Sequence, residues 1–309
     1  MEHHHFHAMG CTMLAVLDAS DPSAGAAVAA VPDWFAAWDQ ALSRFRDDSE
    51  LAVLNRRAGH GWTQLSPTLW AVLAAARAAA RLSDGLVSPT VLSALERAGY
   101  DRDFAAIGDG RAVPAGTAAP AAPWSAIRHD PRRRAVALPA GARLDLGGVA
   151  KGWAADTAVR RLAAHGPALV DAGGDIAVSG PRADGTPWPI GVADPRQPGE
   201  QIALLLLPAG GVATSGRDYR RWRQGAAERH HIIDPRTGLP AATDLLTVTV
   251  VAPSARVAEA AAKTVLILGR EAGLAWLAAR PYLAGLLVSE EGRIDCTVNS
   301  SFELYKRED

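Results

Sequence analysis

A glycine pair followed by a lysine stands where a predicted strand passes into a predicted helix. Residues 144–153 read Leu-Asp-Leu-Gly-Gly-Val-Ala-Lys-Gly-Trp, so Asp145 and Lys151 flank Gly147 and Gly148. Bare glycine backbone at a helix N-terminus points its N–H groups outward and suits an anion. A lysine in the first turn opposes the helix dipole by about 0.3–1 kcal/mol, and a bound phosphate would turn that cost into attraction. A tight turn with an exposed lysine fits the pattern equally well.

A second candidate segment, residues 211–216, places small hydroxyl side chains beside glycine in the order Gly-Val-Ala-Thr-Ser-Gly. Such a backbone lets a ligand approach closely, and we interpret residues 214–216 as a turn. Arginines follow at positions 217, 220, 221 and 223 and could meet a phosphate. Taken singly, however, the last three are more typical of a solvated surface.

Adjacent histidines, His230 and His231, end a predicted strand just before the turn residues 234–238, Asp-Pro-Arg-Thr-Gly. Because side chains alternate along a strand, the two rings face opposite sides. A histidine at a strand end is a plausible general base. The residues alone favour a hydrogen-bonded structural role, and both interpretations stay open at this point.

Short apolar runs bounded by Gly and Pro predict strands, and longer runs with helical periodicity predict helices. The predicted strands are 13–17, 135–138, 168–171, 176–179, 190–193, 202–207, 246–251 and 283–289, and the predicted helices are 67–82, 149–164 and 255–268. Short connections between strands favour antiparallel pairing. We therefore expect an α+β fold of mostly antiparallel sheets with packed helices. Residues 112–123, rich in Ala, Pro and Gly, indicate a loop-rich connection near 104–125.

Composition excludes some partners. The 32 lysines and arginines and 33 aspartates and glutamates give a net charge of −1. The chain as a whole therefore has no general electrostatic attraction for nucleic acid or for an anionic membrane. No apolar stretch is long enough to span a membrane, and no signal peptide is seen, which favours a cytoplasmic protein. The histidines at positions 3–5 and 7 fit a metal site in principle, but residues 1–10 are better interpreted as a frayed, solvated start. Two cysteines, Cys11 and Cys296, make no disulfide framework.

The order of these segments along the chain is more specific for one protein family than any segment alone. The chain resembles the FAD:protein FMN transferases, the ApbE-type flavin transferase family. The matching segments are 8–12 (Ala-Met-Gly-Cys-Thr), 48–51 (Asp-Ser-Glu-Leu) with Asn55, 83–90 (Ser-Asp-Gly-Leu-Val-Ser-Pro-Thr), 145–151, 171–175 (Asp-Ala-Gly-Gly-Asp), 214–216, 231–238 and the helix around Glu259. The resemblance covers nearly the whole chain.

The resemblance implies both the activity and the site. Family members cleave FAD between its phosphates, release AMP and attach FMN by a phosphoester to Thr or Ser of a target flavoprotein. It implies a single transferase domain over residues 1–309, with the FAD cleft between two lobes, and it makes His231 the catalytic base. Ser88 stands where the pattern often has Asp. The implied FAD contacts are Met9, Phe45, Ser88, Pro89, Thr90, Asp145, Lys151, Thr214, Ser215 and Ile232.

The metal site departs from the family pattern. Family members bind magnesium through a carbonyl at the position of Gly148, an Asp at position 259 and a Thr four residues later. Here the side chains are Glu259 and Lys263, so Gly148 and Glu259 are the predicted ligands and a lysine occupies the third position. Glu and Lys at i and i+4 also form an ordinary surface pair worth about 0.2–0.5 kcal/mol. Thr264 cannot substitute, because it points about 140° away, toward the expected core.

Two other functions stay open on the sequence. One is a protein that binds FAD without transferring it, with Lys263 neutralising the diphosphate in place of a metal. The other is an FAD pyrophosphatase, with water as the acceptor. We expect a weak or shifted magnesium requirement for the transferase.

Overall fold

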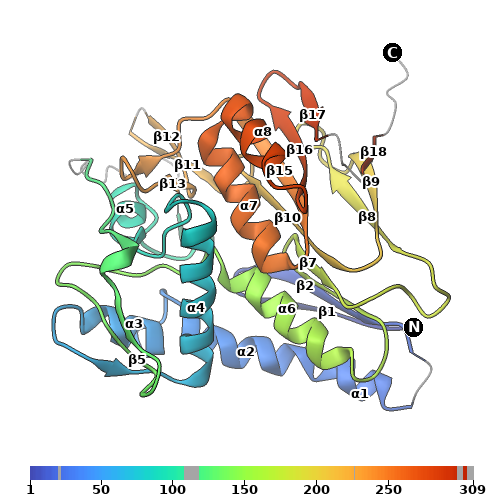
Figure 1. The fold of residues 1–309 in the computed structure, drawn as a ribbon, viewed down its shortest axis with the longest axis horizontal. Helices are drawn as coiled ribbons and strands as arrows, with labels where there is room; N and C mark the ends of the chain where they lie inside the picture. Colours follow the sequence, from blue (N-terminus) through green and yellow to red (C-terminus); the bar gives the residue numbers. More distant parts are fainter. Residues whose placement is uncertain (20–21, 108–117, 226, 298–301, 305–309) are drawn as a thin grey trace. The chain divides into compact units, whose positions relative to one another are not determined.

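The computed structural model describes residues 1–19, 22–107, 118–225, 227–297 and 302–304 (Figure 1). These residues fall into two compact units. We call them the sheet unit, made of Met1–Trp34, Lys151–Asp218 and Thr243–Asp309, and the helical unit, made of Phe35–Ala150 and Tyr219–Ala242. The single domain over 1–309 stays a prediction.

An eight-stranded sheet forms the centre of the sheet unit. In spatial order its strands are β1 (Glu2–Ala8), β2 (Cys11–Leu17), β6 (Ala168–Ala172), β7 (Asp175–Val178), β10 (Gly210–Gly216), β15 (Leu245–Ala252), β16 (Ala284–Ser289) and β17 (Ile294–Cys296). Every neighbouring pair is antiparallel. The predicted α+β class with mostly antiparallel strands is therefore confirmed.

Helices and a second sheet complete this unit. The helices are α1 (Ala24–Ala29), α6 (Ala150–Leu162), α7 (Ala255–Leu268) and α8 (Arg270–Ala278), and the sheet joins β18 (Phe302–Leu304), β9 (Gln201–Leu207) and β8 (Trp188–Ala193). Helix α7 packs along β10 and β15 (Figure 1). Ten of its fourteen residues are buried, including the charged Glu259. A helix that is buried nearly all round can carry a charge inward only where a partner meets it.

Helices and short sheets make up the helical unit. Its elements are α2 (Val31–Leu42, which begins in the sheet unit), α3 (Glu50–Arg56), α4 (Pro67–Leu82), α5 (Leu92–Arg97), two 3-10 turns (Phe104–Ala106 and Trp124–Ala126), and strands β3 (Thr63–Gln64), β4 (Arg128–Asp130), β5 (Ala135–Ala137), β11 (Arg221–Gln224), β12 (Ala227–His230), β13 (Ile233–Asp234) and β14 (Leu239–Pro240). Ser66 caps α4 by accepting from Leu69 N at 3.2 Å, with Pro67 in the first turn.

Two predictions about these elements are wrong. The residues expected to fray form β1, which pairs with β2 along its whole length. Residues 214–216, interpreted as a turn, end the internal strand β10, which pairs with β7 and β15. Within the predicted connection near 104–125, residues 108–117 lie outside the described residues and two 3-10 turns flank them.

Cys11 and Cys296 are both free thiols. Across the described part of the chain, no helix combines the length and the apolar character needed to cross a bilayer.

Candidate functional site

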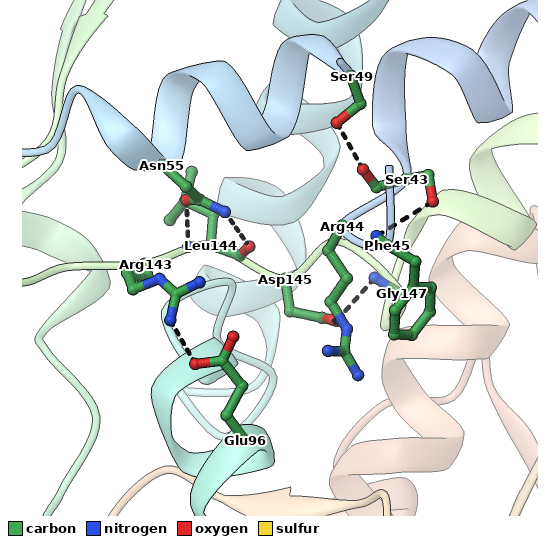
Figure 2. A network of polar contacts seen from close by, with 10 residues as sticks. All are labelled: Ser43, Arg44, Phe45, Ser49, Asn55, Glu96, Arg143, Leu144, Asp145 and Gly147. Atoms are coloured by element: carbon green, nitrogen blue, oxygen red, sulfur yellow. Dashed lines mark hydrogen bonds and ion pairs between the residues drawn. The ribbon is translucent and has the colours of Figure 1, made fainter. Parts of the chain in front are cut away.

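Arg44 and Asp145 form a buried ion pair in the helical unit (Figure 2). Arg44 Nε lies 2.7 Å from Asp145 Oδ2, and the two side chains are 6% and 12% exposed. Gly147 N–H donates to the other carboxylate oxygen at 2.9 Å. The sequence predicts that the Gly147 N–H could bind a phosphate. In the structure this N–H instead donates to the carboxylate of Asp145 and holds it in place.

Helix α3 positions both members of this pair. Asn55 Nδ2 donates to the carbonyl of Leu144 at 2.9 Å, and Leu144 N–H donates back to Asn55 Oδ1 at 2.7 Å. At the start of the helix, the hydroxyl of Ser49 donates to the carbonyl of Ser43 at 2.6 Å. The residues that precede the acid and the arginine are thus tied to one rigid element (Figure 2).

Two aromatic rings enclose the guanidinium. Its carbon lies 4.1 Å from the ring centre of Phe45 and 4.4 Å from that of Tyr100. Tyr100 is buried, and burial raises the pKa of its hydroxyl although Arg220 and Arg44 oppose the shift. Phe45, in contrast, is 40% exposed. An exposed ring on a fixed cation offers a stacking face to a planar aromatic ligand.

One nitrogen of this guanidinium, Arg44 Nη2, is buried and has no hydrogen-bond partner among the described residues. A buried donor left unpaired costs about 1–3 kcal/mol. An acceptor atom on a bound ligand would remove that cost. The sequence interpretation missed Arg44, although its place directly before the predicted flavin contact Phe45 was a usable signal.

Predicted flavin contacts lie beside this pair. Asp145 N–H donates to the carbonyl of Pro89 at 2.8 Å, which joins two predicted segments. Ser88 and Thr90 share a hydrogen bond of 2.8 Å between their hydroxyls, and Thr90 also donates to the carbonyl of Ala122. Ser88 is half-buried and Thr90 is buried. The structure therefore brings Phe45, the 88–90 segment and Asp145 into one site.

The histidine pair separates into two roles. His230 is buried; its Nδ1 accepts from Ile232 N–H at 3.3 Å and its Nε2 lies 3.1 Å from the carbonyl of Ala241. These two contacts require the neutral ring with its proton on Nε2, because Nδ1 accepts and a carbonyl can only accept. His230 is thus a structural residue. His231 lies just beyond the end of β12 and is half-buried.

Met9 occupies the two-residue turn between β1 and β2. Ala8 pairs with Cys11, and Met9 and Gly10 both have positive φ, +49° and +69°. A left-handed conformation is common for glycine in such hairpins but rare for methionine, and it costs of order 1–3 kcal/mol. Such conformations cluster at functional sites, which supports the prediction that Met9 contacts a ligand.

Thr214 and Ser215 are neighbours on β10 and face opposite sides of the sheet. Thr214 is exposed and its hydroxyl lies 2.9 Å from that of Thr249, whereas Ser215 is 5% exposed. Their two side chains therefore cannot both line one cleft, as we had expected. The contact with the ligand stays a prediction for the exposed side chain of Thr214, whereas the buried side chain of Ser215 leaves only its backbone for such a contact. Ile232, also predicted there, is 4% exposed.

Lys151 departs from both interpretations of the glycine–lysine segment, because it is neither exposed nor free. Its Nζ lies 2.5 Å from Asp175 Oδ2. Burial alone would lower the pKa of Lys151, but Asp175 and Glu259 together raise it above the ordinary value. Burial, and after it the negative charge of Glu259, raise the pKa of Asp175 to about 6.

The interpretation of Glu259 and Lys263 as a surface pair is wrong. Lys263 Nζ donates to Glu259 Oε1 at 2.9 Å, yet the Glu259 side chain is fully buried and that of Lys263 is 15% exposed. The second carboxylate oxygen accepts from Gly152 N–H at 3.0 Å. Thr264 points into the core as expected and donates to the carbonyl of Ala260.

The predicted ligands Gly148 and Glu259 do not fit a metal. Among the described residues, no group of three His, Cys, Asp or Glu side chains could hold an ion. Both oxygens of Glu259, the one predicted carboxylate ligand, already accept hydrogen bonds. The other predicted ligand, Gly148, could supply only a carbonyl.

A buried arginine with a nitrogen unpaired within the described residues and an exposed aromatic ring beside it are features of a ligand-binding site. The chain belongs to the ApbE family, whose model matches residues 9–287. This confirms the family that the sequence motifs indicated.

Relatives and solved structures agree with that family. A protein named FAD:protein FMN transferase from Treponema pallidum is 33% identical over 276 residues, which cover 83% of this chain and 75% of the relative. One of the same name from Vibrio cholerae is 31% identical over 166 residues, 52% of this chain and 49% of that protein. The ApbE structure from Thermotoga maritima has a TM-score of 0.81 at 26% identity and covers 96% of each chain.

Proposed function

We propose that this protein is an FAD:protein FMN transferase that cleaves FAD into AMP and FMN and attaches the FMN to a target flavoprotein. Its membership of the ApbE family and its similarity to proteins named FAD:protein FMN transferase support this assignment. The acceptor is a Thr or Ser hydroxyl of the target. A cytoplasmic location stays a prediction from the sequence.

The observation that carries the proposal is the different surroundings of His230 and His231. His230 is held by two backbone contacts and cannot take a proton at Nδ1 without losing one of them. His231, next to it, is therefore the candidate base. The acceptor oxygen attacks the phosphorus of the FMN half, and the bond from that phosphorus to the bridging oxygen breaks. The bridging oxygen leaves with AMP, and the hydroxyl proton passes to His231.

We assign FAD binding first to Arg44, which has a donor unpaired in the described part of the chain, and to Phe45, which has an exposed ring. Arg44 Nη2 would donate to an acceptor atom of FAD, and the exposed ring of Phe45 would stack on one of its planar rings. Asp145 holds the guanidinium in place. The remaining proposed contacts are Met9, Ser88, Pro89, Thr90, Lys151, Thr214, Ser215 and Ile232.

Magnesium, predicted at Gly148 and Glu259, is left out of this proposal. A divalent cation prefers several oxygen ligands, usually with at least one free carboxylate. Both oxygens of Glu259 already accept hydrogen bonds, one of them from the Lys263 ammonium, which stands where a further ligand would be needed and would repel a metal ion. No step of the transfer is therefore assigned to a metal.

The test is a reaction of the purified protein with FAD and a panel of candidate acceptor flavoproteins, followed by chromatography for AMP and intact-mass measurement of the acceptors. We expect AMP together with a gain of one FMN on an acceptor Thr or Ser. AMP with free FMN only would instead show a pyrophosphatase. Bound FAD with no AMP would show a binding protein.

A further inference from the structure

We propose that the Lys263 ammonium binds the FAD diphosphate in place of a metal ion, so that this transferase needs no divalent cation. The inference rests on the proposed function for its substrate. It follows from four buried charged groups of the sheet unit, Lys151, Asp175, Glu259 and Lys263, which we call the lysine–carboxylate cluster.

Close contact between α6 and α7 fixes the carboxylate of Glu259. A Cβ added at Gly152 would lie 2.8 Å from the backbone of Arg256, so glycine allows the two helices to touch. Each helix then caps the other. Asp156 of α6 accepts from the N–H groups of Ala255 and Arg256, at 2.9 and 3.3 Å, and Glu259 of α7 accepts from Gly152 N–H. Glu259 is therefore a helix cap, a role that suits an anion at a helix N-terminus.

The cluster is balanced in charge without a metal. Two ammonium groups, Lys151 and Lys263, face two carboxylates, Asp175 and Glu259. Lys263 acts on Asp175 as well as on its direct partner, and Glu259 acts on Lys151, so the four groups share one field. Without FAD, a divalent ion would add two uncompensated positive charges in a buried place. Such charge is expensive to bury.

Lys263 is the member of the cluster with unused hydrogen-bonding capacity. An ammonium has three N–H donors. Within the described residues, Glu259 Oε1 is the hydrogen-bond partner of Lys263, which leaves two donors. The side chain is 15% exposed while that of Glu259 is fully buried, so the ammonium is the end of the pair that a ligand can reach. Lysine is a common phosphate-binding residue, acting as a point charge.

The first experiment measures metal binding directly, by calorimetric titration of the unaltered protein with magnesium, with and without FAD. We expect no saturable binding at millimolar magnesium. The double variant Glu259→Asp, Lys263→Thr, which removes the ammonium and shortens the acid, should gain binding. Saturable magnesium binding by the unaltered protein would overturn the inference.

The second experiment compares affinities for FAD and riboflavin by fluorescence quenching. Lys263→Met leaves Glu259 unpaired and could fail to fold, so the double variant Glu259→Gln, Lys263→Met is measured beside it. We expect FAD affinity to fall about 10- to 100-fold while riboflavin affinity stays unchanged, since only FAD carries the diphosphate. Arg270→Met removes a cation of the same unit that pairs with Asp295 and should change neither affinity. Equal losses for both flavins, or no loss, would contradict the assignment.

Activity in EDTA separates the two proposals. We expect AMP release and FMN transfer to continue at the rate seen with magnesium. Activity that EDTA abolishes and magnesium restores would overturn the metal-free inference and leave the transferase intact. No AMP in either buffer would instead refute the proposed function, and the affinities for FAD and riboflavin would still decide the role of Lys263.

Discussion

The lysine–carboxylate cluster of the sheet unit and the Arg44–Asp145 pair of the helical unit are both buried, but they differ in what they leave unsatisfied. In the cluster, two cations meet two anions, and Glu259 has a partner for each oxygen. In the pair, one guanidinium nitrogen is buried without a hydrogen-bond partner among the described residues. The charges of the cluster are satisfied within the protein, and the Lys263 side chain is partly exposed. In the pair, Arg44 Nη2 still needs an acceptor, which a ligand could supply.

This contrast separates stability from function. Removing Glu259, the fully buried member of the cluster, should mainly lower the free energy of unfolding, because its partners are left buried and unpaired. Substituting Arg44 or His231 of the helical unit should mainly lower ligand binding or turnover.

The largest expected effect is on turnover, at His231. His231→Ala should lower FMN transfer about 10²- to 10⁴-fold, the usual contribution of a general base, while FAD affinity changes only a few-fold. The matched variant His230→Ala should instead lower stability by about 1–3 kcal/mol, because the Ile232 N–H and the Ala241 carbonyl lose their partner. Transfer rates and urea unfolding measure the two effects. Transfer by His231→Ala at the unaltered rate would place the base elsewhere.

A loss of stability is expected next, at Glu259. Glu259→Ala leaves the Lys263 ammonium and the Gly152 N–H without their acceptor, and breaking a buried ion pair in this way costs about 3–5 kcal/mol. Urea unfolding measures it. Glu271→Ala, at an exposed position of α8, is the control and should change stability by no more than about 0.5 kcal/mol. Equal effects of the two variants would show that the cluster is not structural.

Arg44→Lys should reduce FAD affinity about tenfold, with little change in stability. The ammonium can still pair with Asp145, but the second nitrogen of the planar guanidinium is lost. Fluorescence quenching gives the affinity. Arg46→Lys, at a half-exposed neighbouring position, should leave the affinity unchanged. If Arg44→Lys binds FAD as the unaltered protein does, Arg44 Nη2 does not meet the ligand.

The smallest effect is a pH dependence of stability in the helical unit, away from any proposed ligand. Burial, then the charges of Arg77 and Arg81, lower the pKa of His129 from 6.5 to about 4. Between these values the unfolded chain holds a proton that the folded protein does not, so stability falls as the pH falls from 6.5 toward 4. Because the ring is half-buried, we expect a loss of only about 1 kcal/mol.

His129→Phe, which keeps the contact of the ring with Trp70, should remove that part of the pH dependence. Urea unfolding at neutral pH and at mildly acidic pH measures it. Identical pH profiles for the variant and the unaltered protein would rule out His129 as the source.

The bounds of α4 and α7 could be predicted from the sequence to the residue, since these helices begin and end where their periodicity does. The helices α1, α2, α3, α5 and α8 were not predicted. Strand β1 could not, because its polar side chains show no apolar alternation and it forms only by pairing with β2. Residues 214–216 were interpreted as a turn because small residues precede Gly216, although they end strand β10.

Among the site residues, the motifs located Asp145 and His231, but local periodicity could not indicate that Glu259 is buried. That burial depends on contact with α6 at Gly152, far away in the sequence. Arg44 was missed for a similar reason, since its partner Asp145 lies a hundred residues away along the chain.

The central claim, that this chain moves FMN from FAD to a protein, is tested most directly by the ratio of AMP released to FMN bound covalently on an acceptor. Both products are quantified from one reaction, by chromatography and intact mass. The account predicts equal amounts throughout the reaction, with both lost in His231→Ala. AMP in clear excess over flavinylated acceptor, or flavin bound without any AMP, would contradict it.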